Sequence, residues 1–459
     1  MNLTSLNAIS PIDGRYSNST VLLKNIFSEF SFLKYRIYVE IQWFKKIISM
    51  SKELNIPCID KKSISLLDDI FFSFTEKDAL LIKSIEKKTN HDVKAIEYFL
   101  KKKISVSKSL SKISEFIHFG CTSDDINNIA YALMLKESRK TVILPLWRKL
   151  IDVLHDMICQ YQDISILSLT HGQPATPSTI GKEIANFYYR MQRQYIKFKN
   201  IEILGKINGT TGNYNAHLAA YPLVNWHHIS EEFIISLGIT WNPYTTQIEP
   251  HDYIAELFHC ISLFNTILIN FNRDFWGYIS LDYFKQKLVK EEVGSSVMPH
   301  KINPIDFEKS EGNLGLSNAL MHYMIEKLPI SRWQRDLSDS TVLRNIGVSI
   351  AYAIIAYQSL LAGINKLEIN KLQLLKKLNE NWSILSEPIQ TVMRRYGIKD
   401  SYEKVKQFTR GKKINKNIIH AFIQKLNIPE KEKEKLKYIT PENYIGAASK
   451  IIKNLTKID

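Results

Sequence analysis

The segment from Gly294 to Pro304 carries the densest group of residues that could do chemistry. It reads Gly-Ser-Ser-Val-Met-Pro-His-Lys-Ile-Asn-Pro and is followed by Ile-Asp-Phe-Glu at 305–308, where the next helix is expected to begin. Gly294 permits backbone angles that other residues avoid, the prolines stiffen the segment, and Lys301 supplies a fixed positive charge. A plain connector between helices is the alternative, but a connector has no need of so many polar groups.

Two further stretches combine glycine or proline with polar side chains. Residues 170–177 read Thr-His-Gly-Gln-Pro-Ala-Thr-Pro, and the neighbours of His171 hold its backbone in one shape, as a positioned general acid or base requires. Residues 118–125 read His-Phe-Gly-Cys-Thr-Ser-Asp-Asp and place two hydroxyls and two carboxylates before a helix. The alternatives are a surface histidine in the first stretch and simple N-capping by Ser123 or Asp124 in the second.

In this order, and between long helical segments, the three stretches resemble the signature regions of the fumarase/aspartase superfamily, whose members eliminate fumarate from a substituted succinate. The resemblance covers essentially the whole chain and points to the branch that cleaves succinylated purine nucleotides. The segments that carry this closer likeness are Arg15-Tyr16 after Ser-Pro-Ile-Asp-Gly, Thr89 to Ala95, Gln247 to Asp252, Ser331 to Asp336 and Ser340 to Asn345. The resemblance implies release of fumarate from adenylosuccinate and from the succinylated imidazole carboxamide ribotide.

Such an elimination needs a base for a weakly acidic proton, donors for the resulting dianion and an acid for the departing nitrogen. By resemblance Ser295 is the base, His171 is the acid and Glu308 orients the histidine. Because a serine hydroxyl is a weak base, its alkoxide must be stabilised by backbone N–H groups, by Lys301 and by a helix N-terminus. Two alternatives stay open: Ser295 as a donor to the dianion, and Glu308 as an ordinary acidic residue of a first helical turn.

The resemblance also implies residues that bind a nucleotide with one phosphate and two succinyl carboxylates, for which cations and hydroxyls must converge. The candidates are Arg15, Tyr16, Asn90, His91, Asp92, Thr122, Ser123, Gln247, Lys301, Ile302, Asn303, Lys309, Arg335, Ser340, Thr341 and Arg344. Thr122 and Ser123 are expected at a carboxylate, Gln247 at the base or carboxamide, and Ser340 with Arg344 at the phosphate.

Two of these candidates carry an explicit alternative. Lys309 differs from the amide that the family pattern leads us to expect, and the alternative is that it makes no contact with the substrate. His91 is read as a residue that helps to seat the substrate, and the alternative is a surface histidine. The resemblance implies no cofactor and no metal.

Apolar residues recur at three- and four-residue spacings along the chain, and this periodicity predicts amphipathic helices. The long segments are 125–161, kinked at Pro145, 178–204, 251–280 and 338–364, opened by Ser338 or Ser340. Because alternating strand patterns are hard to find, we predict an all-α protein with a central bundle of long helices flanked by two smaller helical domains. With the resemblance this is a fumarase/aspartase-like fold, and its expected domains are 1–111, 112–364 and 365–459.

The candidate residues lie on different long helices, which would hold several of them far apart in a single subunit. Relatives solve this with a homotetramer in which each active site takes segments from three subunits, so the resemblance implies a homotetramer here. The segment 345–364 carries no charged residue and suits a buried core between subunits. It is also long enough to cross a bilayer, but its Asn345, Ser349 and Gln358 fit lipid poorly, so we expect no membrane partner.

The charge and the cysteine content limit the classes of protein to which this chain can belong. With 61 Lys and Arg against 46 Asp and Glu, the formal net charge is +15, but the lysines are scattered rather than arranged in a stripe, so we expect no nucleic-acid partner. The four cysteines stand far apart and the N-terminus lacks signal-peptide features, which favours a cytoplasmic protein without structural zinc. Another fumarate-releasing lyase, such as argininosuccinate lyase, and an inactive helical scaffold remain as alternatives.

Overall fold

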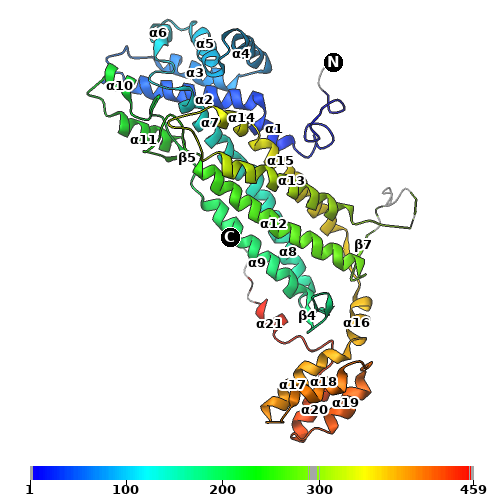
Figure 1. The fold of residues 1–459 in the computed structure, drawn as a ribbon. Coiled ribbons are helices and arrows are strands. Elements are labelled where there is room, and N and C mark those ends of the chain that lie inside the picture. The colour runs from blue at the N-terminus through cyan, green and yellow to red at the C-terminus, as the bar shows by residue number, and fades with distance from the viewer. Residues whose placement is uncertain (1–3, 288, 290–296, 299, 454, 456–459) are drawn as a thin grey trace. The chain divides into compact units, whose positions relative to one another are not determined.

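The structure is a computed structural model and describes residues 4–287, 289, 297–298, 300–453 and 455 of the chain (Figure 1). Contacts between residues divide the chain into two compact units, each built from three separate segments. Unit 1 consists of Met1–Trp147, Gln194–Thr266 and Gly312–Gln358, and unit 2 consists of Arg148–Arg193, Ile267–Glu311 and Ser359–Asp459. The three-domain division expected from the sequence stays a prediction.

Five long helices each have residues in both units. They are α8 (Leu144–Tyr161), α9 (Ile180–Asn200), α12 (Asp252–Ser280), α13 (Ile305–Lys327) and α15 (Ile346–Asn365). The segments predicted over 178–204 and 251–280 correspond to α9 and α12. These helices confirm the predicted all-α fold.

The long helix predicted over 125–161 is interrupted in its middle. It consists of α7 (Ser123–Ser138), a π-helical turn at Arg139–Ile143 and then α8. Pro145 lies in the first turn of α8 and has no N–H to donate to the preceding turn. The wider π turn absorbs this mismatch without ending the helix, which is why the expected kink takes the form of a bulge.

Two stretches are long and apolar enough to cross a membrane by length and composition, but both are mostly buried within the protein. They are α12 and Ser338–Asn365, in which 67% and 72% of the apolar window is buried. The second stretch is not one continuous helix, because α14 (Ser338–Leu343) is followed by a turn at Arg344 and Asn345 before α15 begins. Burial of this extent is typical of core helices.

In unit 1, aromatic side chains form a buried layer between the long helices. The Trp147 indole of α8 stacks on the Phe264 ring of α12 with the ring centroids 3.7 Å apart. Phe198 of α9 lies 4.9 Å from the same indole, and Tyr357 of α15 contacts Phe264 edge to face at 5.8 Å. Four helices thus share one close-packed core.

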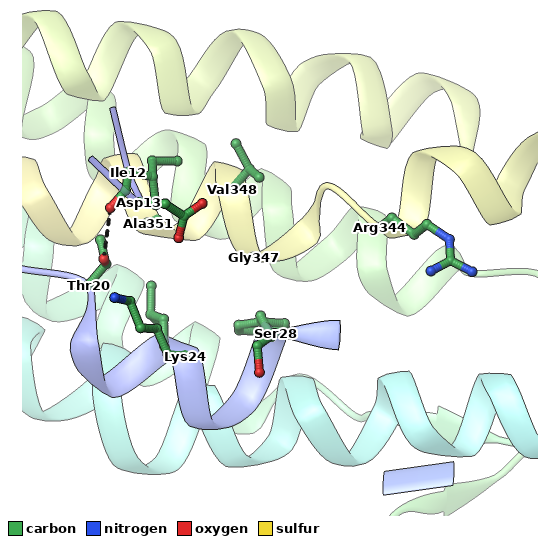
Figure 2. A pocket seen from close by; sticks show the side chains of 11 residues that line it. Ile12, Asp13, Thr20, Lys24, Ser28, Arg344, Gly347, Val348 and Ala351 are labelled. Carbon is green, nitrogen blue, oxygen red and sulfur yellow. Dashed lines mark hydrogen bonds between the residues drawn. The ribbon is translucent and has the colours of Figure 1, made fainter. Parts of the chain in front are cut away.

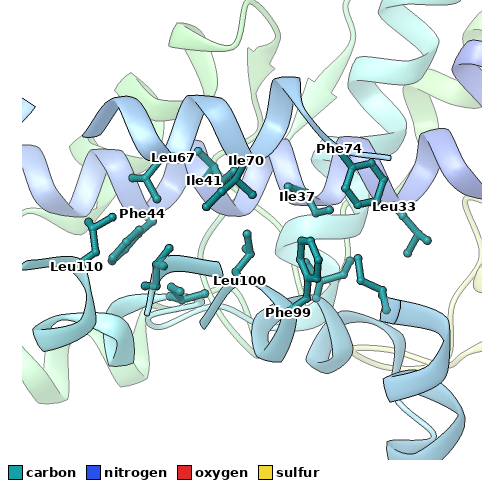
Figure 3. Close-up of a cluster of buried hydrophobic side chains, with 14 of the residues drawn as sticks. Leu33, Ile37, Ile41, Phe44, Leu67, Ile70, Phe74, Phe99, Leu100 and Leu110 are labelled. Carbon is teal, nitrogen blue, oxygen red and sulfur yellow. The ribbon is translucent and has the colours of Figure 1, made fainter. Parts of the chain in front are cut away.

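The first part of unit 1 is a cluster of shorter helices around a core of its own. The helices are α1 (Val21–Phe27), α2 (Glu29–Ser49), α3 (Lys61–Phe72), α4 (Glu76–Thr89), α5 (Asp92–Ile104), α6 (Lys108–Lys112) and a 3-10 turn at Ser114–Phe116. Figure 3 shows Phe44, Phe74 and Phe99 among leucine and isoleucine side chains of this core. The core fixes the N-terminus of α5, where three predicted binding residues lie.

The C-terminal part of unit 2 is also helical. Its elements are α16 (Lys371–Asn379), a 3-10 turn at Trp382–Leu385, α17 (Ser386–Arg395), α18 (Ser401–Thr409), α19 (Lys416–Gln424), α20 (Glu430–Tyr438) and α21 (Ala448–Ile451). The core between them contains Trp382, Ile389, Met393 and, from an earlier part of the chain, Leu167. Leu167 follows the first strand, so the segment that bears His171 is packed into this C-terminal core.

Strands in the described part of the chain are short and form two-stranded sheets. The antiparallel pairs are β1 (Ser165–Ile166) with β4 (Ser178–Thr179), β2 (Leu169–Thr170) with β3 (Gln173–Pro174) and β7 (Phe284–Gln286) with β8 (Leu367–Ile369). The parallel pair is β5 (Leu204–Gly205) with β6 (Thr240–Trp241), and α10 (Asn215–Ala220) and α11 (Trp226–Ser236) lie between these two strands in the sequence. The first two pairs are the stem and the tip of one hairpin.

Candidate active site

The predicted site residues divide between the two units. Unit 1 contains Arg15, Tyr16, Asn90, His91, Asp92, Thr122, Ser123, Gln247, Arg335, Ser340, Thr341 and Arg344, and unit 2 contains His171, Lys301, Ile302, Asn303, Glu308 and Lys309. Ser295, the predicted base, lies outside the described residues. The residues assigned to the phosphate are therefore in unit 1, whereas the predicted acid is in unit 2.

Thr122 and Ser123 lie at the N-terminus of α7. Thr122 is the N-cap, and its backbone N–H donates to the Asp125 carboxylate at 2.8 Å as part of a capping box. The alternative in which Ser123 or Asp124 caps this helix is wrong, because the cap lies one residue earlier. Ser123 is thus the first helical residue, where free N–H groups and the helix dipole favour an anion such as a carboxylate.

The Asp125 carboxylate links this cap to a second loop. It accepts hydrogen bonds from the backbone N–H groups of Asn208 and Gly209 at 3.0 and 3.1 Å. The Lys206 ammonium lies 2.8 Å from the same carboxylate, and both side chains are fully buried. Removing one partner of a buried ion pair leaves the other charge uncompensated, so this pair strongly constrains the loop that carries Thr122.

The same loop packs closely against His217. Gly120 has a φ of +72°, and a Cβ at this position would lie 2.3 Å from Nε2 of His217, so only glycine fits. Burial lowers the pKa of His217 to about 4, which leaves its imidazole neutral at pH 7. The pKa of His118, in contrast, is raised above the ordinary value. Burial acts to lower it, but the Glu40 carboxylate, 2.6 Å from Nδ1, outweighs the effect of burial.

Arg344, which the sequence assigns to the substrate phosphate, lies between two carboxylates. Its Nη1 is 3.2 Å from Oε2 of Glu29, and its Nη2 is 3.6 Å from Oδ2 of Asp92. The buried Arg36 guanidinium binds the same Asp92 oxygen at 2.6 Å. Burial acts to raise the pKa of Asp92, but the charge of Arg36, the Val93 N–H and Arg344 lower it below the ordinary value. In this structure Asp92 holds two arginines in place.

Asp92→Asn is expected to lower the free energy of unfolding by about 3 kcal/mol at pH 7, because the buried Arg36 charge loses its carboxylate. The folded pKa of Asp92 lies below its unfolded value of about 3.9, so the stabilisation is present above that pH and is lost as the pH falls through the folded pKa. Urea unfolding at pH 7 and pH 3.5 should therefore show a smaller difference from wild type at the lower pH. Asp69→Asn on the exposed side of α3 is the control, and an equal loss at both pH values would contradict the ion-pair account.

Arg335 belongs to a buried ionic cluster that the sequence analysis missed. Its Nη1 lies 3.4 Å from Oδ1 of Asp124, and Nε2 of His251 lies 3.4 Å from Oδ2 of Asp339. Glu249 accepts a hydrogen bond from the His251 backbone at 2.7 Å. Burial acts to lower the pKa of His251, but Asp339, Glu249 and Asp124 raise it above the ordinary value. Glu249 and His251 lie close to Gln247 in the sequence, but the pairing of His251 with Asp339, 88 positions away, left no sequence signal.

The other predicted binding residues of unit 1 lie at helix ends and in loops. His91 caps α5 by accepting the Lys94 backbone N–H on Nδ1 at 3.1 Å, and Asn90 before it has a φ of 51°. Gln247 donates to the Thr210 carbonyl at 3.0 Å. Ser340 and Thr341 lie on the short helix α14.

The N-terminal segment that carries Arg15 and Tyr16 lines a cavity of about 150 Å³ together with Arg344 (Figure 2). Thr20 fixes this segment by donating a hydrogen bond to the Ile12 carbonyl at 3.2 Å. The Arg15 guanidinium lies 6.0 Å from the centre of the Tyr16 ring, and Arg15 is exposed. Ile12, Asp13 and Thr20 of the N-terminal segment line this cavity with Arg344, whereas Arg15 and Tyr16 do not.

In unit 2, His171 lies at the tip of a β-hairpin. Thr170 pairs with Gln173, and the two residues between them, His171 and Gly172, have φ values of 53° and 71°. Positive φ at both positions is characteristic of the type I′ turn, which is favoured in two-residue hairpin loops. The turn holds the backbone of His171 in one shape, as the sequence predicts, and its side chain is exposed.

Glu308 lies in the first turn of α13, where it accepts a hydrogen bond from Nε1 of Trp276 at 3.0 Å. Within the part of the chain that the structure describes, no hydrogen bond joins Glu308 to His171. Lys301 and Lys309 are exposed, and the Ile302 carbonyl accepts a hydrogen bond from Gln286 of β7 at 3.1 Å. Asn303 follows Ile302 and is half-buried.

Unit 1 contains candidate anion-binding groups, and unit 2 contains an exposed imidazole. Among the residues that the structure describes, no group of three or more His, Cys, Asp or Glu side chains could hold a metal ion. An exposed imidazole can transfer a proton only to a ligand that reaches it. The chemistry that fits is proton transfer on an anionic substrate.

Comparison with known sequences gives one consistent family. The lyase family matches residues 14–316, and the adenylosuccinate lyase C-terminal family matches residues 331–445. An adenylosuccinate lyase of Buchnera aphidicola subsp. Acyrthosiphon pisum is 73% identical over 455 residues, which cover 99% of this chain and 100% of the relative. An adenylosuccinate lyase of Escherichia coli K12 is 60% identical with the same coverage.

Solved structures with the same fold are more distant in sequence. A 3-carboxy-cis,cis-muconate lactonizing enzyme from Pseudomonas putida has a TM-score of 0.75 at 17% identity, covering 94% of this chain and 95% of that one. A fumarate lyase from Mesorhizobium sp. BNC1 has a TM-score of 0.75 at 15% identity, covering 95% and 97%. At these identities the likeness concerns the fold alone.

Proposed function

The chain belongs to the adenylosuccinate lyase family of the fumarase/aspartase superfamily, and we propose how its residues carry out that family's reaction. Its activity is the release of fumarate from adenylosuccinate, which gives AMP, and from the succinylated imidazole carboxamide ribotide. The observation that carries this function is the identity of 60–73% with adenylosuccinate lyases over nearly the full length of both chains.

In the proposed mechanism two side chains move protons at opposite ends of the broken bond. Ser295, as an alkoxide stabilised by backbone N–H groups and Lys301, takes the proton from the carbon next to a succinyl carboxylate. The electron pair left on that carbon is held as the aci-carboxylate dianion and then forms the double bond of fumarate as the C–N bond breaks. His171 gives a proton to the departing nitrogen, and Glu308 orients the imidazole.

The proposed binding groups follow the charges of the substrate. Arg344 with Ser340, and Arg15 from the facing N-terminal segment, bind the phosphate, because bidentate guanidinium contacts suit its geometry. Thr122 and Ser123 bind a succinyl carboxylate, which the N-terminus of α7 favours. The remaining proposed contacts are those of Tyr16, Asn90, His91, Asp92, Gln247, Lys301, Ile302, Asn303, Lys309, Arg335 and Thr341.

We further propose a cytoplasmic homotetramer in which several subunits complete each site. Large apolar side chains are exposed along the long helices of the single chain, which supports burial against other copies: Tyr189, Ile196, Leu263, Trp276, Leu316 and Tyr323. All four cysteines are free thiols, as expected in a reducing compartment. Light scattering should give four times the 53.2 kDa chain mass, and a monomer would contradict the shared site.

The function is tested by following fumarate release from adenylosuccinate by absorbance with the purified full-length chain. We expect turnover of adenylosuccinate and of the succinylated ribotide, and no turnover of argininosuccinate. Argininosuccinate cleavage without adenylosuccinate cleavage would favour the other lyase of the superfamily. A correctly folded chain that releases no fumarate from any of the three would indicate an inactive scaffold.

A further inference from the structure

The hairpin that carries His171 makes a polar contact with α17 of the C-terminal region. The Thr176 hydroxyl, two residues after β3, donates a hydrogen bond to Oε2 of Glu387 at 2.6 Å. The Tyr444 hydroxyl donates to the same oxygen at 3.2 Å. One carboxylate on α17 therefore connects the returning strand of the hairpin to residue 444, near the end of the chain. All three residues belong to unit 2.

Three independent contacts hold the same hairpin at its base. The Ser165 hydroxyl of β1 donates to the backbone carbonyl of Glu442 at 2.6 Å, and the Ser449 hydroxyl donates to the carbonyl of Gln162 at 3.2 Å. Leu167 is 3% exposed and belongs to the C-terminal hydrophobic core. The first strand of the hairpin stem is thus fixed to the C-terminal region.

Thr176 is the anchored position closest to the tip on the returning strand. From there to His171 the hairpin is held by its own ladder, with the Ala175 N–H donating to the Ser168 carbonyl at 2.8 Å and Thr170 paired with Gln173. A displacement at Thr176 is therefore transmitted to the turn. The Glu387 carboxylate is the charged partner, and hydrogen bonds to charged groups are stronger than neutral ones.

We propose that Glu387 is a positioning residue for His171, which it fixes through Thr176 with Tyr444 as a second donor. This inference rests on the proposed role of His171 as the general acid. It gives the C-terminal region a part in catalysis, although Glu387 contacts no reacting atom. Tyr444 suits a permanent donor, because burial and the Glu387 charge raise its pKa to about 12.

The test compares Glu387→Ala, Glu387→Gln and Thr176→Val in the full-length chain, with kcat and KM for adenylosuccinate measured across pH. We expect Glu387→Ala and Thr176→Val to lower kcat by about 10- to 100-fold with KM within about twofold of wild type, because small misplacements of a catalytic group slow chemistry while the binding groups of unit 1 are untouched. Glu387→Gln should recover most of the rate, since its amide oxygen still accepts the Thr176 hydrogen bond. Glu442→Ala is the matched control, because it removes a nearby carboxylate and leaves the backbone carbonyl that Ser165 uses.

The outcomes separate this inference from the function on which it rests. If a His171 variant is inactive but Glu387→Ala and Thr176→Val retain wild-type kcat, the positioning role is wrong and the general acid stands. If the His171 variant is fully active, the proposed mechanism fails first. A loss of kcat in Glu442→Ala equal to that in Glu387→Ala would indicate a general effect of charge and overturn the inference. Should Glu387→Ala fail to fold, Thr176→Val breaks the same hydrogen bond from the exposed hairpin and decides alone.

Discussion

His171→Asn is expected to lower kcat for adenylosuccinate by about 1000-fold while the chain keeps its fold. General acid–base groups contribute about 10²- to 10⁴-fold to rates, and asparagine cannot donate a proton as an acid at neutral pH. The choice of asparagine follows from the turn. His171 has a φ of 53° and precedes Gly172, and Asn-Gly is the favoured pair in a type I′ turn. Alanine would be strained at this φ, so His171→Ala would mix a loss of chemistry with a change in the hairpin.

This prediction is tested by measuring kcat and KM by steady-state kinetics and the melting temperature by thermal unfolding. The melting temperature of His171→Asn should stay within a few degrees of wild type, and KM should change little, because the predicted phosphate and carboxylate contacts are in unit 1. His228→Asn, on an exposed face of α11, is the control for a histidine substitution away from the site. A His171→Asn enzyme with more than about a tenth of the wild-type kcat would exclude His171 as the general acid.

The His171 turn shows what local sequence can determine. The order Thr-His-Gly-Gln-Pro specifies a tight turn because glycine accepts positive φ, so the backbone of the histidine follows from its nearest neighbours. The anchor at Glu387 lies 211 positions from Thr176, and nothing in either local sequence indicates the other. Long-range contacts of this kind need the fold before they can be seen.

The ion pairs of the predicted substrate-binding residues also could not be predicted from local sequence. Arginines at the family positions could be predicted from the resemblance, and Arg344 was one of them. That Arg344 lies between Glu29 and Asp92, and that Asp92 also binds the buried Arg36, depends on how α2, α5 and α14 pack. The sequence analysis includes Asp92 among the substrate contacts by resemblance alone. The packing gives it two arginine partners.

Ser295→Ala is expected to have the largest effect, lowering kcat by at least about 1000-fold. If Ser295 is the base, its loss leaves no group at this position to take the proton, and the alternative donor role would cost about 10²- to 10³-fold. Ser296→Ala, one residue along the same segment, is the matched control and should retain most of the rate. Because the ranges for the two roles meet near 1000-fold, the alanine variant establishes that Ser295 is needed but does not separate them.

Ser295→Cys separates the two roles by the sign of its pH dependence. A free thiol has a pKa of about 8.5, so the fraction of thiolate rises between pH 7 and 9. If this position acts as the base, residual kcat should rise over that range, since the thiolate is the active form. If it acts as a donor to the dianion, kcat should fall, because a thiolate has no proton to donate and repels the negative charge. We expect the rise, measured relative to wild type at each pH, and a fall would assign proton abstraction to another group.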